Sequence, residues 1–401
     1  MTAREAVETL LAGRPRTPAV PFAESYAPAN IALAKYWGKR DEALNLPTAS
    51  SLSISLGDLG SHVRLAPAPE GAPADTVALN GAPLSPDTPF ARRAVAFFDL
   101  FRPSPSFRFD LQARNTIPTA AGFASSASGF AALAKAADAL FGWNLPRQSL
   151  SILARLGSGS AARSLADGFV EWHAGERPDG MDSFATPLPD RWPALRVGAC
   201  VLSSAEKPVG SRDGMRRSVR TCPFYSAWPD LVARDIATLH DAIAARDIAL
   251  LGATAESNCL AMHSLMMATR PPILYFLPET LTAIRAVWAA RADGLPVWFT
   301  MDAGPNLKLL FESSSESSVR ALFPTATLVS PFAWFPQHRR SWEMSGKERG
   351  VSFVKSRVGR AASPLAAGNG DAQGNVMGGA DASRPESGGN ASAHFRPLPL
   401  A

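Results

Sequence analysis

The chain has 401 residues, of which 46% are hydrophobic and 19% charged, and its formal net charge is +5. This length and composition exclude a fibrous or wholly disordered protein and favour two or three globular domains. The positive charge does not indicate a nucleic-acid-binding domain, because residues 336–361 alone carry seven Lys and Arg side chains against two Glu. We therefore expect no nucleic-acid partner.

The three cysteines are Cys200, Cys222 and Cys259, and no Cys-x-x-Cys pair occurs. An odd number of widely spaced cysteines favours buried thiols in a reducing compartment over disulfides or a metal site. The first twenty residues are too charged for a secretory signal, and no stretch approaches the roughly 18 apolar residues of a membrane helix. We expect a cytoplasmic protein with no membrane partner.

In the first half of the chain, residues 50–56 alternate serine with apolar residues, a period of two that predicts a half-buried strand. Asn80-Gly81 predicts a hairpin turn. The same reasoning predicts strands at 62–65, 76–79 and 107–111, and helices at 92–101 and 128–141. Strands and helices mix without a regular βαβ order, which indicates an α+β fold.

The second half begins with an apolar strand at 196–203 and continues with helices at 228–250 and 278–292. A further strand at 298–302 ends in a Gly-Pro turn. From residue 361 onward Gly, Ala, Ser, Asn and Pro dominate, a composition that buries too little apolar surface to offset chain entropy. We expect two domains, 1–195 and 196–335, followed by a basic and then low-complexity disordered tail, 336–401.

Residues 115–130, NTIPTAAGFASSASGF, are tiny or hydroxylated and lead into an apolar helical pattern. Small side chains let backbone N–H groups approach an anion, and a helix N-terminus favours negative charge. The segment lacks the Walker pattern, so a packed Ala/Ser-rich turn is the alternative. The candidate phosphate-binding residues are Pro118, Ala121, Gly122, Ala124, Ser125, Ser126 and Ser128.

Two further segments carry cations. The apolar run in PANIALAKYWGKR, residues 28–40, breaks into Lys35, Tyr36 and Lys39, which suits a polyanionic ligand. The Gly/Ser-rich segment 157–163 offers Ser160 and Arg163 to an anionic group. A solvated basic turn and a plain helix cap, respectively, are the structural alternatives.

A glycine-flanked loop at 207–215 offers Ser211 and Arg212 after a predicted strand, where binding groups are common. Asp302 stands at the end of another strand, and as a carboxylate it could take a proton from a substrate hydroxyl. A cation such as Lys35 would keep the Asp302 pKa low enough for ionisation. An ordinary polar connection and an Asx cap remain the structural alternatives.

Together, the segments 30–40, 118–128, 157–163 and 302–306 resemble the diphosphomevalonate decarboxylase family of the GHMP kinase superfamily. The resemblance extends from about residue 24 to about residue 330, and the motifs KYWGKR, PTAAGxASS and DAGPN are typical of the decarboxylase branch. It implies an N-terminal domain like domain 2 of ribosomal protein S5, a ferredoxin-like C-terminal domain, and a site in the cleft between them.

The resemblance also implies the chemistry. Such enzymes use ATP and Mg²⁺ to phosphorylate the 3-hydroxyl of mevalonate 5-diphosphate, then lose phosphate and CO2 to give isopentenyl diphosphate, and they form homodimers. The implied roles are base for Asp302, with Lys35 beside it; substrate carboxylate binding for Arg163, Asn30 and Ser160; and diphosphate binding for Tyr36, Lys39, Ser211 and Arg212. We assign no side chain as a metal ligand.

One departure from the family pattern is Asp167, four residues after Arg163. On a helix the two side chains could pair, and Asp167 would then compete with the substrate. The rival functions are a phosphomevalonate decarboxylase, a mevalonate 3-kinase-like enzyme and a catalytically silent nucleotide-binding protein. Lys39 and Arg212 favour the diphosphate as substrate.

Overall fold

A computed structural model of the protein describes residues 1–116, 125–205 and 207–332. Pro118, Ala121, Gly122 and Ala124, and the predicted tail 336–401, lie outside the described residues. Two main sheets form. The strands of the first are β1 Ala23–Ala34, β4 Ser51–Pro67, β5 Thr76–Leu79, β6 Ala82–Pro83, β7 Phe109–Asn115, β8 Phe169–Trp172 and β9 Ala185–Pro187.

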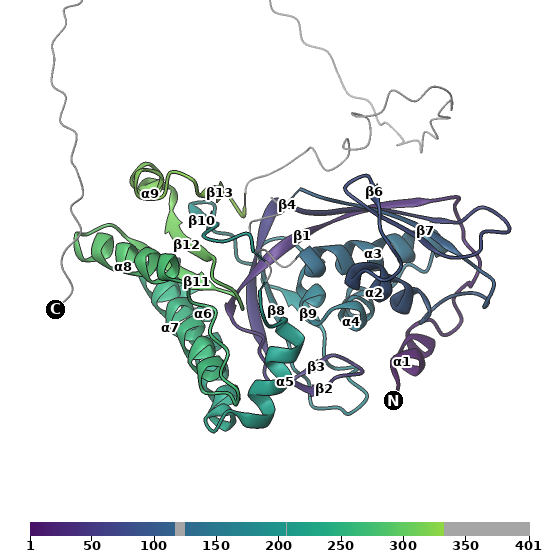
Figure 1. Cartoon of the computed structure of the whole chain (residues 1–401), viewed down its shortest axis with the longest axis horizontal. Coiled ribbons are helices and arrows are strands. Elements are labelled where there is room, and N and C mark those ends of the chain that lie inside the picture. Colours follow the sequence, from purple (N-terminus) through teal and green to yellow (C-terminus); the bar gives the residue numbers. More distant parts are fainter. Residues whose placement is uncertain (117–124, 206, 333–401) are drawn as a thin grey trace, which may run out of the picture. The chain divides into compact units, whose positions relative to one another are not determined.

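The first sheet has the strand order β6-β5-β7-β4-β8-β9, and β1 pairs antiparallel with β4. Its helices are α1 Ala3–Leu10, α2 Pro89–Phe98, α3 Ser125–Phe141 and α4 Arg147–Gly157. Figure 1 shows α2, α3 and α4 on the same side of this sheet. Helix α3 packs directly on β1 and β4, because its alanines allow close approach while Phe130 and Leu140 fill the core.

The long strand β4 corrects two predictions. Residues 50–56 and 62–65 belong to one strand of 17 residues rather than two, and its first half is buried on both faces. Leu52, Ile54 and Leu56 pack into a core shared with the C-terminal helices. The predicted half-buried strand is therefore wrong in one respect, because the alternating serines are buried as well, and Ser53 donates to the carbonyl of Val170 on β8. Hydroxyls with such partners can be buried at little cost.

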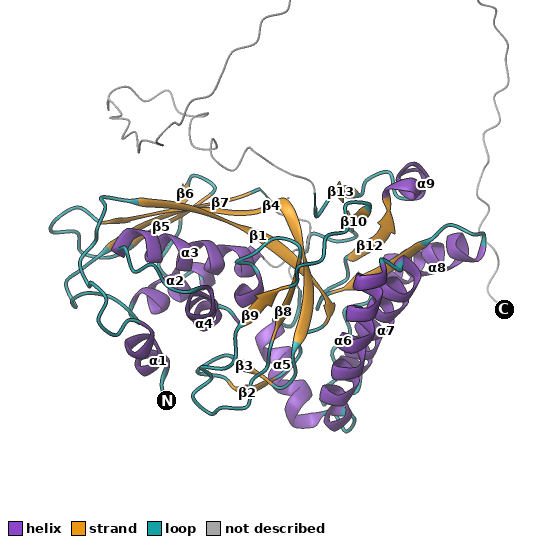
Figure 2. Ribbon diagram, turned by 180° about the vertical axis from the view of Figure 1, so that it is seen from behind, coloured by secondary structure: helices purple, strands orange, loops and turns teal. Residues whose placement is uncertain are grey.

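The second sheet has the order β11-β12-β10-β13, all antiparallel. Helices α6 and α7 run side by side along it, as Figure 2 shows from behind. These elements are β10 Leu195–Cys200, α5 Ser211–Thr221, α6 Trp228–Ala245, α7 Ile248–Met267, α8 Pro278–Ala292, β11 Val297–Met301, β12 Leu307–Glu312, α9 Glu316–Leu322 and β13 Thr327–Val329. Both sheets are mixed with helices, so the α+β prediction is confirmed.

The predicted helix 228–250 is wrong at its end. The chain breaks at Arg246, whose φ of 53° is left-handed, and Asp247 then caps a new helix by accepting from the N–H of Leu250. Helix α7, which the sequence analysis missed beyond residue 250, contacts β1 and β11. It therefore joins the two sheets at the strand ends where the candidate site lies.

The other predicted elements are confirmed with shifts of a few residues at their ends. Asn80 and Gly81 both have positive φ between β5 and β6, as a tight hairpin requires. The three cysteines are buried and free, as predicted. No helix in the described part of the chain is long and apolar enough to cross a membrane.

Candidate active site

One cavity of about 360 Å³ gathers the predicted residues. Six cationic side chains and a single carboxylate line it, an imbalance that suits a polyanionic ligand. The candidate residues on its wall are Asn30, Lys35, Tyr36, Lys39, Ser126, Ser160, Arg163, Ser211, Arg212 and Asp302. Residues far apart in the sequence therefore share one site.

Lys35 and Asp302 form the centre of the cavity. Lys35 leaves the end of β1, and its ammonium lies 3.1 Å from Oδ1 of Asp302, which directly follows β11. The Lys35 side chain is almost fully buried, whereas that of Asp302 is 32% exposed. The backbone N–H of Lys35 donates to Asn258 on α7, which fixes the turn. The predicted pairing of Lys35 with Asp302 is confirmed.

A second lysine, Lys308 on β12, lies 3.8 Å from Oδ2 of Asp302. Burial raises the pKa of Asp302, but Lys35 and Lys308 outweigh burial and hold the pKa at about 2. Asp302 is thus ionised at neutral pH. Behind it, Nε2 of His263 donates to the Asp302 carbonyl at 3.1 Å, and burial lowers the pKa of His263 to about 4, so this ring is neutral.

Arg163 ends the short helix η1, Gly159–Arg163, and is only 3% exposed. Its guanidinium donates to the hydroxyl of Ser51 and to Oδ1 of Asn30, the latter at 3.4 Å. Asn30 in turn donates to the hydroxyl of Ser164 at 2.7 Å. Alternation along β1 and β4 places Asn30 and Ser51 on the face opposite the shared apolar core. The guanidinium is therefore held rigidly at the cavity wall.

The predicted competition from Asp167 is wrong. The helix ends at Arg163, so the four-residue helical spacing never forms, and Asp167 is exposed. Its charge instead acts on Lys135, where burial lowers the lysine pKa and Asp167 partly offsets that effect. Nothing in this arrangement blocks Arg163 from an anionic ligand.

A second group of cations occupies another part of the wall, and we call Lys39, Arg93 and Arg212 the inner cation cluster. Arg93 and Arg212 both donate to the carbonyl of Gly157, at 3.1 and 3.5 Å. The hydroxyl of Tyr36 is buried with no hydrogen-bond partner among the described residues. Three cations and an unpaired hydroxyl are what a multiply charged oxyanion requires.

Ser211 and Arg212 lie on a helix rather than on the predicted loop. Ser211 is the first residue of α5 and Arg212 the second. Lys207 donates to the Ser211 hydroxyl at 2.8 Å and to the carbonyl of Ala303 at 3.0 Å. The start of α5 thus adds N-terminal N–H groups and Arg212 to the cavity wall, and Lys207 just before it lies near Asp302.

Lys39 gives the inner cation cluster a pH dependence. Burial, followed by the field of Arg212, lowers the pKa of Lys39 to about 8. The ammonium is therefore lost from the free protein as the pH rises through about 8. We expect the affinity for inorganic diphosphate to fall from pH 7 to pH 9 more steeply for wild type than for Lys39→Arg, because arginine stays charged. Calorimetric titrations measure the diphosphate affinity of both proteins across this pH range. Protonation of the ligand affects both proteins equally, so it cancels in the comparison. The same pH dependence in the two proteins would contradict the role of Lys39.

The described end of the predicted phosphate loop divides into two parts. Ser126, in the first turn of α3, lines the cavity. Ser128 does not, because it is fully buried and its hydroxyl lies 2.8 Å from that of Ser61 on β4. Ser128 thus fixes the helix to the sheet, and Ser126 is the residue placed to meet a ligand.

Sequence reasoning missed three cations of the site. Arg93 lies on α2, far from every motif, and no local pattern marks it. Lys207 is in the recognised loop but was not singled out. Lys308 sits inside an apolar strand, LKLLFE, and is 1% exposed in the structure. A lone lysine in such an apolar run is a sequence signal that could have marked it as a functional charge.

The fold and the charged cavity together assign the class of the protein, which has two α+β domains with the GHMP kinase fold. Models of the diphosphomevalonate decarboxylase-like N-terminal domain and of the mevalonate 5-diphosphate decarboxylase C-terminal domain match residues 27–185 and 197–345. Diphosphomevalonate decarboxylase from Candida albicans is 35% identical over 82% of this chain and 93% of its own. The chain belongs to the diphosphomevalonate decarboxylase family.

Solved structures of mevalonate diphosphate decarboxylases support the same family assignment. That of mevalonate diphosphate decarboxylase from Enterococcus faecalis superposes with a TM-score of 0.72 at 36% identity, covering 78% of this chain and 97% of that one. Another, described as MDDEF in complex with MVAPP, AMPPCP and magnesium, gives 0.72 at 37% identity over 77% and 97%.

Proposed function

We propose that the chain catalyses the ATP-dependent decarboxylation of mevalonate 5-diphosphate to isopentenyl diphosphate, ADP, phosphate and CO2. The observation that carries this proposal is an ionised carboxylate, Asp302, in a cavity whose other charged side chains, among the described residues, are all cationic. The substrate has two anionic ends, a carboxylate and a diphosphate. Arg163 with Asn30 suits the first end, and the inner cation cluster suits the second.

Asp302 is the base for the 3-hydroxyl in this proposal. A tertiary alcohol is a poor nucleophile, so a positioned carboxylate must accept its proton as the bond to phosphorus forms. A pKa near 2 makes a weak base, but a polyanion bound beside Lys35 shares that cation and raises the Asp302 pKa. The proton acceptor thus becomes stronger when the phosphate groups are bound.

Arg163 then governs the loss of CO2. When the new phosphate leaves, positive charge develops at C3, and breaking the bond to the carboxylate supplies the electron pair that quenches it. Arg163 is held by Ser51 and Asn30, so it fixes the carboxylate in one orientation. Its burial, beside the buried ring of Trp172 at 6.0 Å, limits the access of water to the cation.

ATP and Mg²⁺ fit the residues that are present. Ser126 and the start of α3 would meet the nucleotide phosphates, with Lys35 and Lys207 on the facing wall. No group of three or more acidic, His or Cys side chains that could hold a metal occurs among the described residues. Such sparse protein ligation is usual where phosphates supply most of the oxygens around Mg²⁺. When bound, Mg²⁺ supplies neutralisation of the charge that develops on the transferred phosphoryl group.

A substrate panel tests the proposal. Purified protein is incubated with ATP, Mg²⁺ and either mevalonate, its 5-phosphate or its 5-diphosphate, while ADP and CO2 are measured separately. We expect the highest kcat/KM with the diphosphate, because the inner cation cluster offers three cations to its distal phosphate. A preference for the monophosphate, or ADP without CO2, would assign the chain to the corresponding rival function instead.

The low-complexity end of the chain gives a separate prediction. Removal of residues 362–401 should leave kcat and kcat/KM within about twofold, since that composition cannot form a packed wall of the site. The melting temperature serves as the folding control. A large loss of activity at an unchanged melting temperature would show that the segment takes part in the reaction.

We also propose that the enzyme works in the cytoplasm as a homodimer. Three buried free thiols suit a reducing compartment. Leu281 and Trp288, seven residues apart on one face of α8, are 47% and 44% exposed, which suits an interface. Light scattering after size exclusion measures the mass, and a monomer at micromolar concentration would exclude the dimer.

A further inference from the structure

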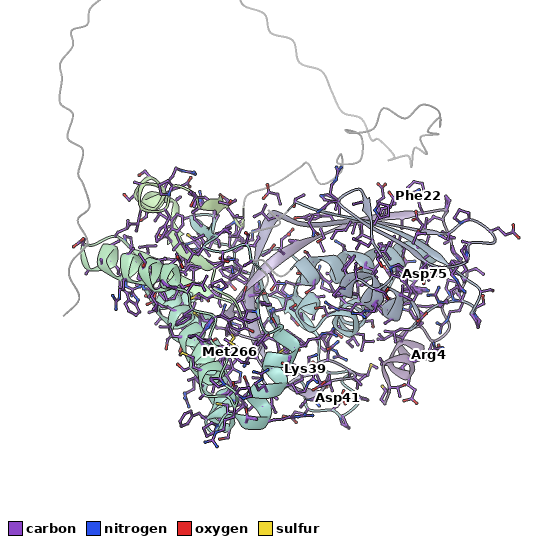
Figure 3. All side chains as sticks on the ribbon, in the orientation of Figure 1. Arg4, Phe22, Lys39, Asp41, Asp75 and Met266 are labelled. Atoms are coloured by element: carbon purple, nitrogen blue, oxygen red, sulfur yellow. The ribbon has the colours of Figure 1, made fainter. Side chains whose placement is uncertain are left out.

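A second cavity, of about 330 Å³, adjoins the inner cation cluster. It shares Lys39, Arg212 and Met215 with the active-site cavity, so the two cavities adjoin along these side chains. Lys39 is labelled in Figure 3, beside α5. We call this second cavity the outer groove. The proposed reaction assigns no role to it.

One face of α5 supplies most of the outer groove. Arg212, Arg216 and Arg220 follow each other at intervals of four residues, which aligns them along the helix axis. Arg40 and Lys39 complete the lining, so that five cations meet one carboxylate, Glu42. Helix α5 therefore presents a row of positive charge that begins at the groove and ends at the inner cation cluster.

The row is not neutralised by its neighbours. Arg216 and Glu42 lie 3.4 Å apart, but their side chains are 43% and 58% exposed, and such surface pairs are weak. Arg217, which pairs with Asp213 at 3.0 Å, does not line the groove. At Lys39, burial and then Arg212 are the main causes of the lowered pKa; Glu42 opposes them, and Arg93 and Arg216 add smaller effects in the lowering direction.

We propose that the outer groove is a capture site for the diphosphate group, which meets Arg216 and Arg220 before it reaches the inner cation cluster. The identity of the substrate in this inference rests on the proposed function. The class of ligand, a multiply charged phosphate oxyanion, follows from the charge of the groove alone. A cleft lined by one sign of charge concentrates such ligands and speeds their association. Arg216 and Arg220 thus act on encounter and do not touch the reacting atoms.

The test compares Arg216→Gln/Arg220→Gln with a control, Arg147→Gln/Arg234→Gln, that removes the same charge from exposed positions outside both cavities. Steady-state rates with mevalonate 5-diphosphate are measured at low and high salt. The range of charge interactions shrinks from roughly 30 Å at about 0.01 M salt to about 3 Å at about 1 M. If the two arginines act in capture, the variant should lose kcat/KM only at low salt. If they contact the bound substrate directly, the loss should remain at high salt.

At low salt we expect the groove variant to lose roughly 5- to 10-fold in kcat/KM with kcat unchanged, and the loss to vanish at high salt. The control should follow wild type throughout. A loss that persists at high salt, an equal loss in the control, or no loss at low salt would each overturn the capture role.

Inorganic diphosphate separates this inference from the substrate assignment. Its affinity, measured by calorimetry without ATP, should show the same salt-dependent loss in the groove variant. If mevalonate 5-diphosphate were not turned over but inorganic diphosphate still showed that loss, the capture role would stand and the proposed substrate would fall. An identical diphosphate affinity in wild type and variant at low salt would overturn the capture role itself.

Discussion

An Asp302→Asn enzyme is expected to lose on the order of 10²- to 10⁴-fold in kcat, because removal of a general base typically has an effect of this size. The amide keeps the shape of the carboxylate but cannot accept the proton of the 3-hydroxyl. ADP and CO2 formation should fall together, since phosphoryl transfer precedes the loss of CO2. Quenched time courses for each product measure the two rates.

Nucleotide affinity and melting temperature serve as the controls for this variant. Lys35 and Lys308 lose their shared anion in Asp302→Asn, and unpaired buried charges destabilise a fold. We therefore expect a lower melting temperature that ATP partly restores, because its phosphates can pair with Lys35 on the cavity wall. If ADP release continued at the wild-type rate while CO2 alone vanished, Asp302 would act after phosphoryl transfer and would not be the base.

Replacing Arg163 with lysine is expected to lower kcat/KM by on the order of 10²-fold, because a hydrogen bond to a charged group contributes about 1.5–3 kcal/mol and lysine cannot keep all those that arginine makes. Charge is retained, but an ammonium cannot donate in parallel to Ser51, to Asn30 and to a substrate carboxylate as the planar guanidinium can. The loss should appear in CO2 formation at least as strongly as in ADP formation. The same product assays measure it.

Arg234→Lys is the matched control, because Arg234 is exposed on α6 and outside the active-site cavity. This variant should retain wild-type kinetics. Near-normal kcat/KM in the Arg163→Lys enzyme would mean that Arg163 does not hold the substrate carboxylate, whatever its position in the structure.

The sequence predicts those site residues that stand at the end of a strand or helix and within a recognisable motif. Lys35 follows an apolar strand and Asp302 follows another, and strand ends are where charged groups emerge from a core. Arg163 follows a Gly/Ser segment, and Gly159 has the room it needs only as glycine, because a Cβ there would meet the Tyr36 hydroxyl at 2.7 Å. These local signals place each residue, and the α+β packing brings them together.

Other features depend on contacts that no local pattern encodes. Arg93 reaches the site from α2 only because α2 and α4 pack together on one side of the first sheet. The alternation at 50–56 predicts a half-buried strand, yet its serines are buried as well, because Arg163 donates to Ser51 and Ser53 donates to Val170. Asp167 read as a partner of Arg163, but the chain leaves the helix at Arg163 and turns its carboxylate outward.

The most direct test of the central claim is the release of CO2 from carboxyl-labelled mevalonate 5-diphosphate, with and without ATP, alongside ADP. Asp302 and Arg163 line one cavity, so phosphoryl transfer and decarboxylation should occur on the same bound molecule. The account predicts one CO2 for each ADP and no CO2 when ATP is omitted. ADP formed without CO2, or CO2 formed without ATP, would contradict it.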